Sequence, residues 1–117
     1  MAHARPIPQL PWGWRSMWVI AMFDLPTDTP KARKAYVRFR KNLLEDGFAM
    51  MQYSVYSRHC ASIENAGVHV KRMSDLVPAA GEVRFLTITD KQFDRIKVYV
   101  GKKRRKTPPP PSQLEFF

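Results

Sequence analysis

Hydrophobic and polar positions follow two different periods along this chain, and the changes of period outline its elements. Seven apolar residues run without interruption from Met17 to Phe23, which is typical of a strand covered on both faces, so we expect this strand inside a sheet. Residues 82–89 and 95–100 alternate apolar with polar side chains and are also predicted to be strands. The stretch 48–59, rich in aromatic, Met and β-branched residues, favours two short strands, although no Gly, Pro or Asn marks a turn inside it.

Two helices are predicted between these strands. Thr29 suits an N-cap, Pro30 suits the first helical position, and apolar residues then recur every three or four positions until Gly47 ends the pattern. Ser62 is suited to cap a second helix, whose apolar spacing continues to Pro78. The resulting order predicts an α+β fold of the ferredoxin-like βαββαβ type with an additional C-terminal strand.

The pattern also divides the 117 residues into three parts. Residues 1–16 read as an irregular N-terminal arm, 17–101 as the ferredoxin-like domain, and 102–117 as a basic and Pro-rich tail that ends in a short apolar segment. We interpret that apolar tip as a partner-binding segment that adds as a strand to an exposed sheet edge, with a frayed chain end as the alternative. The tip residues are Leu114, Phe116 and Phe117.

A surplus of positive charge points to the class of partner. Twenty Lys and Arg residues face ten Asp and Glu residues, which gives a net charge of +10. Such a surplus favours a polyanion, with nucleic acid ahead of an anionic membrane. The basic residues gather on the predicted first helix and directly after the last predicted strand; a solvated helix face and a disordered tail are the alternatives to phosphate binding. The candidate nucleic-acid-binding residues are Lys31, Arg33, Lys34, Arg38, Lys41, Lys102, Lys103, Arg104 and Arg105.

One cysteine and three histidines restrict the chemistry of the chain. Cys60 has no partner for an internal disulfide, which is typical of a reducing compartment, so we expect a cytoplasmic protein. The longest apolar run has about a third of the residues needed to span a bilayer, so it is not expected to be a transmembrane helix. With nucleic acid as the favoured partner, no membrane partner is expected. His59 and His69 lack a spaced partner for a metal site or a catalytic dyad, so each is expected to be structural or at the surface. Ser54 lies in no recognisable nucleophile motif.

Asp24 is the carboxylate that directly follows the predicted central strand. A carboxylate in this position points into the loops at the rim of the sheet, where a hard cation such as Mg²⁺ takes oxygen ligands. Asp28 lies in the next turn, and Asp90 and Asp94 lie far along the chain, so no acidic cluster is apparent. A two-fold dimer would supply a second Asp24. The alternative is that Asp24 caps the turn or pairs with an arginine.

Several short motifs, taken in order, resemble a known family. They are VIAMFDLPT at 19–27, RKAY at 33–36, DGF at 46–48, QYSVY at 52–56 and LTITDKQF at 86–93. Their order and spacing resemble the second CRISPR-associated protein family, Cas-two, and within it the members that accompany type II systems. The resemblance covers roughly residues 17 to 101, and the apolar ending of the chain resembles the ending of those members.

The resemblance implies a homodimer that is a metal-dependent endoribonuclease or deoxyribonuclease. It further implies that the dimer bridges two dimers of the CRISPR integrase, Cas-one, during spacer acquisition. The family's acidic ligand falls on Asp24, the implied catalytic residue, and the two copies in the dimer would hold one Mg²⁺, with Mn²⁺ as an alternative. The implied nucleic-acid partner is a DNA duplex, with single-stranded RNA as a further partner. A non-catalytic DNA-binding scaffold and a toxin-like or regulatory RNA-binding module are the competing interpretations.

Overall fold

The computed structural model describes residues 15–101. Residues 1–14, which make up most of the expected N-terminal arm, and 102–117, with the expected basic tail and its apolar tip, lie outside the described residues. Every helix in this described part is too short or too polar to span a lipid bilayer.

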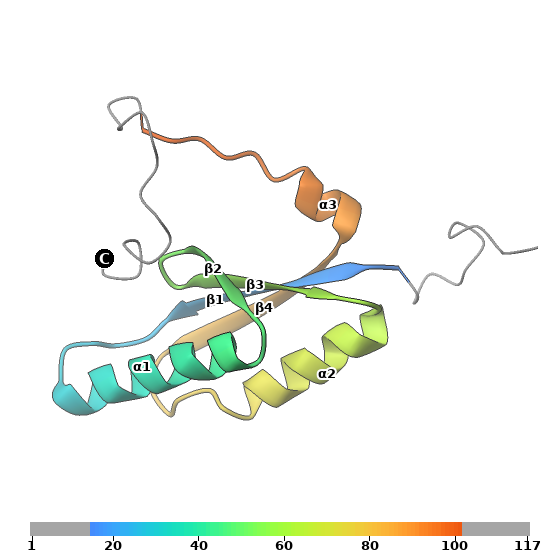
Figure 1. Cartoon of the computed structure of the whole chain (residues 1–117). Coiled ribbons are helices and arrows are strands. Elements are labelled where there is room, and N and C mark those ends of the chain that lie inside the picture. The colour runs from blue at the N-terminus through green and yellow to red at the C-terminus, as the bar shows by residue number, and fades with distance from the viewer. Residues whose placement is uncertain (1–14, 102–117) are drawn as a thin grey trace, which may run out of the picture.

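Four strands form one antiparallel sheet in the order β2-β3-β1-β4, and β1 is central, as its unbroken apolar run predicted. Figure 1 shows α1 and α2 against one face of the sheet and α3 on the opposite side. This arrangement is the ferredoxin-like α+β fold expected from the sequence. The elements are β1 (Met17–Asp24), α1 (Pro30–Glu45), β2 (Ala49–Gln52), β3 (Val55–Cys60), α2 (Ile63–Ser74), β4 (Glu82–Thr89) and α3 (Asp90–Asp94).

Strand β1 separates two different surfaces. Its odd-numbered residues, from Met17 to Phe23, are buried in a core with Phe39 and Leu43 of α1 and Met73 of α2. Because side chains alternate along a strand, the even-numbered residues of β1 face the other side of the sheet. The last residue on that second side is the exposed Asp24 of the predicted metal site.

Both long helices begin where the sequence predicted. The Thr29 hydroxyl accepts a hydrogen bond from the backbone N–H of Ala32, and Pro30 occupies the first turn of α1. The Ser62 hydroxyl caps α2 in the same way, by accepting from the N–H of Asn65. These caps satisfy backbone donors that a helix leaves without intrahelical partners.

Asp46 joins α1 to α2. Its carboxylate is buried and accepts a hydrogen bond from His69, whose Nδ1 lies 2.8 Å from Oδ2, while Oδ1 contacts the guanidinium of Arg72. The backbone carbonyl of Asp46 accepts from Nε of Arg58 at 2.7 Å. His69 is therefore a buried structural residue, which agrees with one of the two roles expected for it.

The structure corrects the predicted strand at 95–100. The chain forms α3 at Asp90–Asp94, and residues 96–100 form no strand. Thr89 and Gln92 make a reciprocal capping box that starts α3 directly after β4, so the chain leaves the sheet (Figure 1). The apolar alternation of 96–100 is real, but within the described chain these residues lie beside no sheet edge.

The end of α2 differs from the expectation, and the structure supplies the turn that the sequence left unmarked between 48 and 59. Helix α2 ends at Ser74 and is capped by Asp75, four residues before Pro78, where the apolar spacing stops. The two short strands expected between 48 and 59 exist, and they meet at a turn formed by Tyr53 and Ser54. Ser54 adopts a φ of 64°, a left-handed conformation that Gly or Asn adopts more easily, so the sequence gives little sign of this turn.

Candidate nucleic-acid interface and acidic site

Asp24 lies at the exposed end of the central strand, on the sheet face opposite α1 and α2. The register of β1 and β4 places Glu82 directly opposite Asp24. Residues paired in this way share one face of the sheet, with Cβ atoms typically about 5 Å apart. Glu82 is therefore a second carboxylate beside Asp24 that the sequence analysis missed. Finding it required the register between two strands almost sixty positions apart.

Arg84 adds a positive charge to the same corner. Its guanidinium lies 3.2 Å from Oε2 of Glu82, and both side chains are largely in solvent. The residues surround an open hollow of about 290 Å³ that Asp24, Tyr53 and Ser54 also line. Among residues 15–101, no three His, Cys, Asp or Glu side chains are grouped to hold a metal ion. The described residues of one chain thus offer two carboxylates to a hard cation at this corner, and one of them is already paired with Arg84.

The backbone around Asp24 is held from two sides. The N–H of Phe23 donates to the carbonyl of Ser54 at 3.0 Å, which fixes the end of β1 to the turn between β2 and β3. On the other side Gly81 has a φ of +98°, and a Cβ at that position would lie 2.8 Å from the backbone oxygen of Asp24 and 2.6 Å from the Leu25 side chain. Only glycine fits there without displacing the end of β1.

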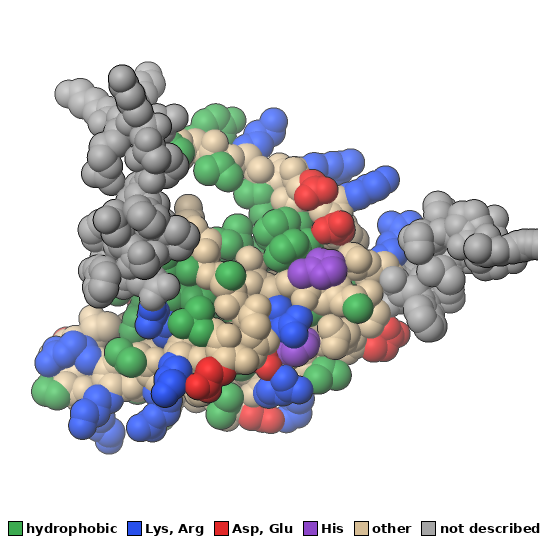
Figure 2. Space-filling view, viewed as in Figure 1, with side chains coloured by type: hydrophobic (Ala, Val, Ile, Leu, Met, Phe, Trp, Pro, Cys, Tyr) green, Lys and Arg blue, Asp and Glu red, His purple; other side chains and the backbone are tan. Residues whose placement is uncertain are grey.

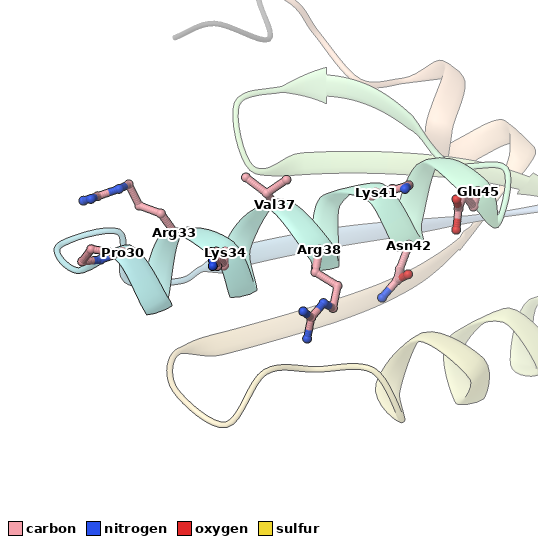
Figure 3. Close-up of a pocket in the computed structure, with 8 residues that line it drawn as sticks. All are labelled: Pro30, Arg33, Lys34, Val37, Arg38, Lys41, Asn42 and Glu45. Atoms are coloured by element: carbon pink, nitrogen blue, oxygen red, sulfur yellow. The ribbon is translucent and has the colours of Figure 1, made fainter.

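The cationic face of α1 consists of five exposed side chains, and it begins one short loop after Asp24. Figure 3 shows Arg33 and Arg38 pointing to opposite sides of the helix, so the charges form a broad band rather than a single line. Arg33 also donates a hydrogen bond to the Thr27 carbonyl at 3.1 Å, which ties this end of the band to the loop after β1. The members of the cationic face are Lys31, Arg33, Lys34, Arg38 and Lys41.

Figure 2 places these charges on the surface, where Lys and Arg side chains line α1. A second hollow, of about 540 Å³, lies between the N-terminal half of α1 and the loop before β4, and Lys31 and Arg38 line it. All five predicted cations of the helix are therefore accessible to phosphate groups. The other four predicted cations, at 102–105, lie outside the described residues.

The sheet face that bears Asp24 is only partly covered. At its far end, Trp18 stacks on Phe93 of α3 with ring centres 3.8 Å apart, and its Nε1 donates to Oδ1 of Asp90 at 2.7 Å. Toward Asp24 the cover ends, and Leu86 of β4 is 46% exposed. Figure 2 shows hydrophobic side chains gathered between α3 and the strands. The exposed residues Val98, Tyr99 and Val100 come after α3 in the chain.

The remaining candidate groups of the sequence have structural roles or none in this site. Cys60 is buried, and burial raises the pKa of its thiol, which disfavours the reactive thiolate. The rings of His59 and Trp18 meet at an angle of 67°, with ring centres 5.2 Å apart. Ser54 lies in the turn between β2 and β3, and its hydroxyl lies 3.0 Å from the hydroxyl of Tyr36. Burial raises the pKa of Tyr36 to about 12, although the hydrogen bond with Ser54 acts in the opposite direction.

Comparison with known proteins places this chain in a family. The model of the CRISPR associated protein Cas2 family matches residues 17–96. A CRISPR-associated endoribonuclease Cas2 from Parvibaculum lavamentivorans is 83% identical over 101 residues, which cover 86% of this chain and all of the relative. The protein of the same name from Flavobacterium psychrophilum is 50% identical over 104 residues, 89% of this chain and 90% of the relative.

Solved structures agree at the level of the fold. Streptococcus pyogenes Cas2, crystallised at pH 6.5, matches 71% of this chain and 99% of its own with a TM-score of 0.54 and 20% sequence identity. A second Cas2 crystal structure matches 80% of this chain and 98% of its own with a TM-score of 0.52 and 22% identity. With a family model that spans most of the described domain, and relatives covered along nearly their whole length, the chain belongs to the CRISPR-associated Cas2 family.

Proposed function

We propose that this protein acts as a homodimer in CRISPR adaptation, where it binds nucleic acid and cleaves phosphodiester bonds with a divalent metal ion. The observation that carries the proposal is the placement of Asp24 at the rigid end of β1, one loop before the cationic face of α1. The loop 25–29 thus joins the acidic end of β1 directly to the first turn of that helix. The relatives are named endoribonucleases, which supports cleavage of RNA.

The partly covered sheet face supports the homodimer. Leu86 is nearly half exposed, and Val98 and Val100 are exposed at 78% and 56%. Large exposed apolar side chains favour burial against a partner. A second copy of the chain would cover this face and would add a second Asp24 and Glu82 to the pair of carboxylates that one chain supplies.

The donor chemistry of the acidic site fits a hard cation. Asp24 from each protomer would hold Mg²⁺, or Mn²⁺ in its place, through carboxylate oxygens. When bound, such an ion supplies positive charge against the scissile phosphate and lowers the pKa of a water nucleophile. The chain's own contribution is to fix the Asp24 backbone through Gly81 and Ser54 and to bind flanking phosphates with α1.

Replacing Asp24 with Asn tests the catalytic role. We expect cleavage of single-stranded RNA or duplex DNA in Mg²⁺ to fall by about 100-fold or more, because several kcal/mol of transition-state stabilisation depend on the ion. Binding in EDTA should stay close to that of the unmodified protein. Asp28→Asn, an exposed carboxylate in the following loop, is the matched control and should keep activity. Equal cleavage by the Asp24 variant would remove Asp24 from the mechanism.

A second proposed function is that of a DNA-binding scaffold that bridges two dimers of the CRISPR integrase, Cas-one. The observation that favours it is the disparity between the two sites. Five exposed cations lie on α1, whereas the acidic site has two carboxylates per chain, one of them paired with Arg84. In this function the cationic face holds the middle of a duplex, and no cleavage by Asp24 is needed.

Neutralising the cationic face tests the scaffold. Lys34→Ala and Arg38→Ala should each lower the slope of log affinity against log salt by about one for duplex DNA. Lys71→Ala is the matched control, because this exposed lysine of α2 already pairs with Asp75 at 2.8 Å. Bridging itself is measured by integration assays with purified integrase: a scaffold predicts full integration by the Asp24→Asn variant and reduced integration by the α1 variants. An unchanged salt slope in both α1 variants would refute the assignment.

A further inference from the structure

An aromatic residue occupies the turn between β2 and β3, next to the acidic site. Tyr53 and Ser54 form this turn, where polar or small residues are the usual choice. Tyr53 leaves 53% of its surface in solvent. Neither the sequence motifs nor the proposed chemistry of the acidic site gives this exposed ring a role.

The Tyr53 ring is held in place by its neighbours. It stacks on the ring of Tyr36 with centres 6.0 Å apart and an angle of 23° between the planes. The Tyr36 hydroxyl is hydrogen-bonded to Ser54, and Ser54 is bonded in turn to the backbone of Phe23. One side of the Tyr53 ring is thus supported by the protein, and little rotamer freedom remains to be lost when a ligand binds.

Each of the two tyrosines also borders one hollow of the proposed interface. Tyr53 lines the hollow that holds Asp24 and Arg84, and Tyr36 lines the hollow that holds Lys31 and Arg38. Figure 3 shows the β2–β3 hairpin beside α1, in agreement with the contact between the two rings. An aromatic ring between cations combines the two elements of single-strand recognition, which are stacking for the bases and positive charge for the backbone.

We propose that Tyr53 is a base-stacking residue, which receives an unpaired base of a nucleic-acid strand whose phosphates lie on the cationic face of α1. The inference rests on the proposed function, because it assumes that the chain binds nucleic acid. It adds a preference for strands with accessible bases next to Asp24. A base inside a duplex is already stacked on both sides, so an unpaired segment or a frayed end is the ligand.

The test compares two polymers that differ only in their bases. Affinities of the full-length protein are measured in EDTA by fluorescence anisotropy for a labelled oligothymidine of about ten nucleotides and for an abasic oligomer of equal length; oligouridine forms the RNA arm. One stacked base is expected to favour the base-containing strand by about tenfold. Tyr53→Leu should bring the ratio close to one and leave the salt slope unchanged, because the phosphate contacts remain.

Tyr53→Phe and Tyr53→Trp are the matched variants, since both keep an aromatic ring, and both should keep the preference. The inference is overturned if Tyr53→Leu keeps the full ratio, or if it weakens both polymers equally, which would indicate a structural role. Thermal melting of each variant verifies that the fold is retained. If the unmodified protein shows no salt-dependent binding to either polymer, the proposed function fails as well, so the two failures are distinguishable. If Tyr53→Leu lowers the affinity for oligothymidine alone, the ligand is DNA; if it lowers the affinity for oligouridine alone, the ligand is RNA.

Discussion

The two faces of the sheet use the same strands for different purposes. On the face covered by α1 and α2, Val19, Ala21 and Leu43 have no exposed surface. On the opposite face, cover is provided around Trp18 by α3 but stops before Leu86 and Asp24. The covered face therefore supplies the stability of a single chain, whereas the partly covered face is available for partners and ligands.

A leucine-to-alanine substitution on each side of the sheet should give the largest difference in stability between the two faces. Leu43→Ala removes a fully buried side chain and should lower the free energy of unfolding by about 3 kcal/mol, through lost burial and a cavity. Leu86→Ala should cost about 1 kcal/mol or less in a single chain and should instead weaken the proposed self-association. Urea unfolding and light scattering measure the two effects. Comparable losses of stability would mean that both faces belong to one core.

A pair of glycines tests how rigidly Asp24 is held. Gly81→Ala places a Cβ against the backbone of Asp24 in a left-handed conformation, so we expect a loss of about 2 kcal/mol in unfolding free energy and weakening of the proposed metal-dependent cleavage. Gly67→Ala is the control, because a Cβ there meets nothing within 4 Å and the position is helical. It should stabilise the protein by about 0.5 kcal/mol or more. Similar melting temperatures for the two variants would contradict the close approach at Gly81.

The smallest effect concerns the hydroxyl that supports the Tyr53 turn. Tyr36→Phe loses one hydrogen bond and should cost about 1 kcal/mol at neutral pH. The pKa of Tyr36 is raised from 10.0 to about 12 in the folded protein, so its contribution is complete below pH 10 and is lost as the pH rises through about 12. The free energy of unfolding should therefore fall less between about pH 9 and 12 in Tyr36→Phe, which lacks this titration, than in the unmodified protein. An identical pH dependence would show that this tyrosine does not limit alkaline stability.

Local signals in the sequence predicted much of the fold. Thr29 and Pro30 marked the start of α1, Ser62 marked the start of α2, and the seven apolar residues of β1 indicated a central strand. Each of these signals acts within a few residues, through a cap or through side-chain alternation. The same kind of signal also placed Asp24 at the end of β1, where the structure has it.

The features that the sequence did not reveal depend on distant contacts. Glu82 joins Asp24 only through the register of two strands, and the Tyr53 ring gains its position from α1. The alternation in 96–100 predicted a strand, but a strand also needs an edge to pair with, and the helix capped by Thr89 carries these residues away from the sheet. Pattern alone does not show where the partner of a strand lies.

The clamp on Trp18 determines how the chain leaves the sheet. Stacking on Phe93 and the bond to Asp90 fasten α3 to the sheet at both its beginning and its end. Helix α3 is thus held in place against the sheet. The residues directly after it therefore start from a defined point and in a defined direction. A segment attached in this way loses less orientational freedom on meeting another surface than one attached through a swivelling linker. Two side chains of this five-residue helix, Asp90 and Phe93, therefore set the direction in which the following residues leave the sheet.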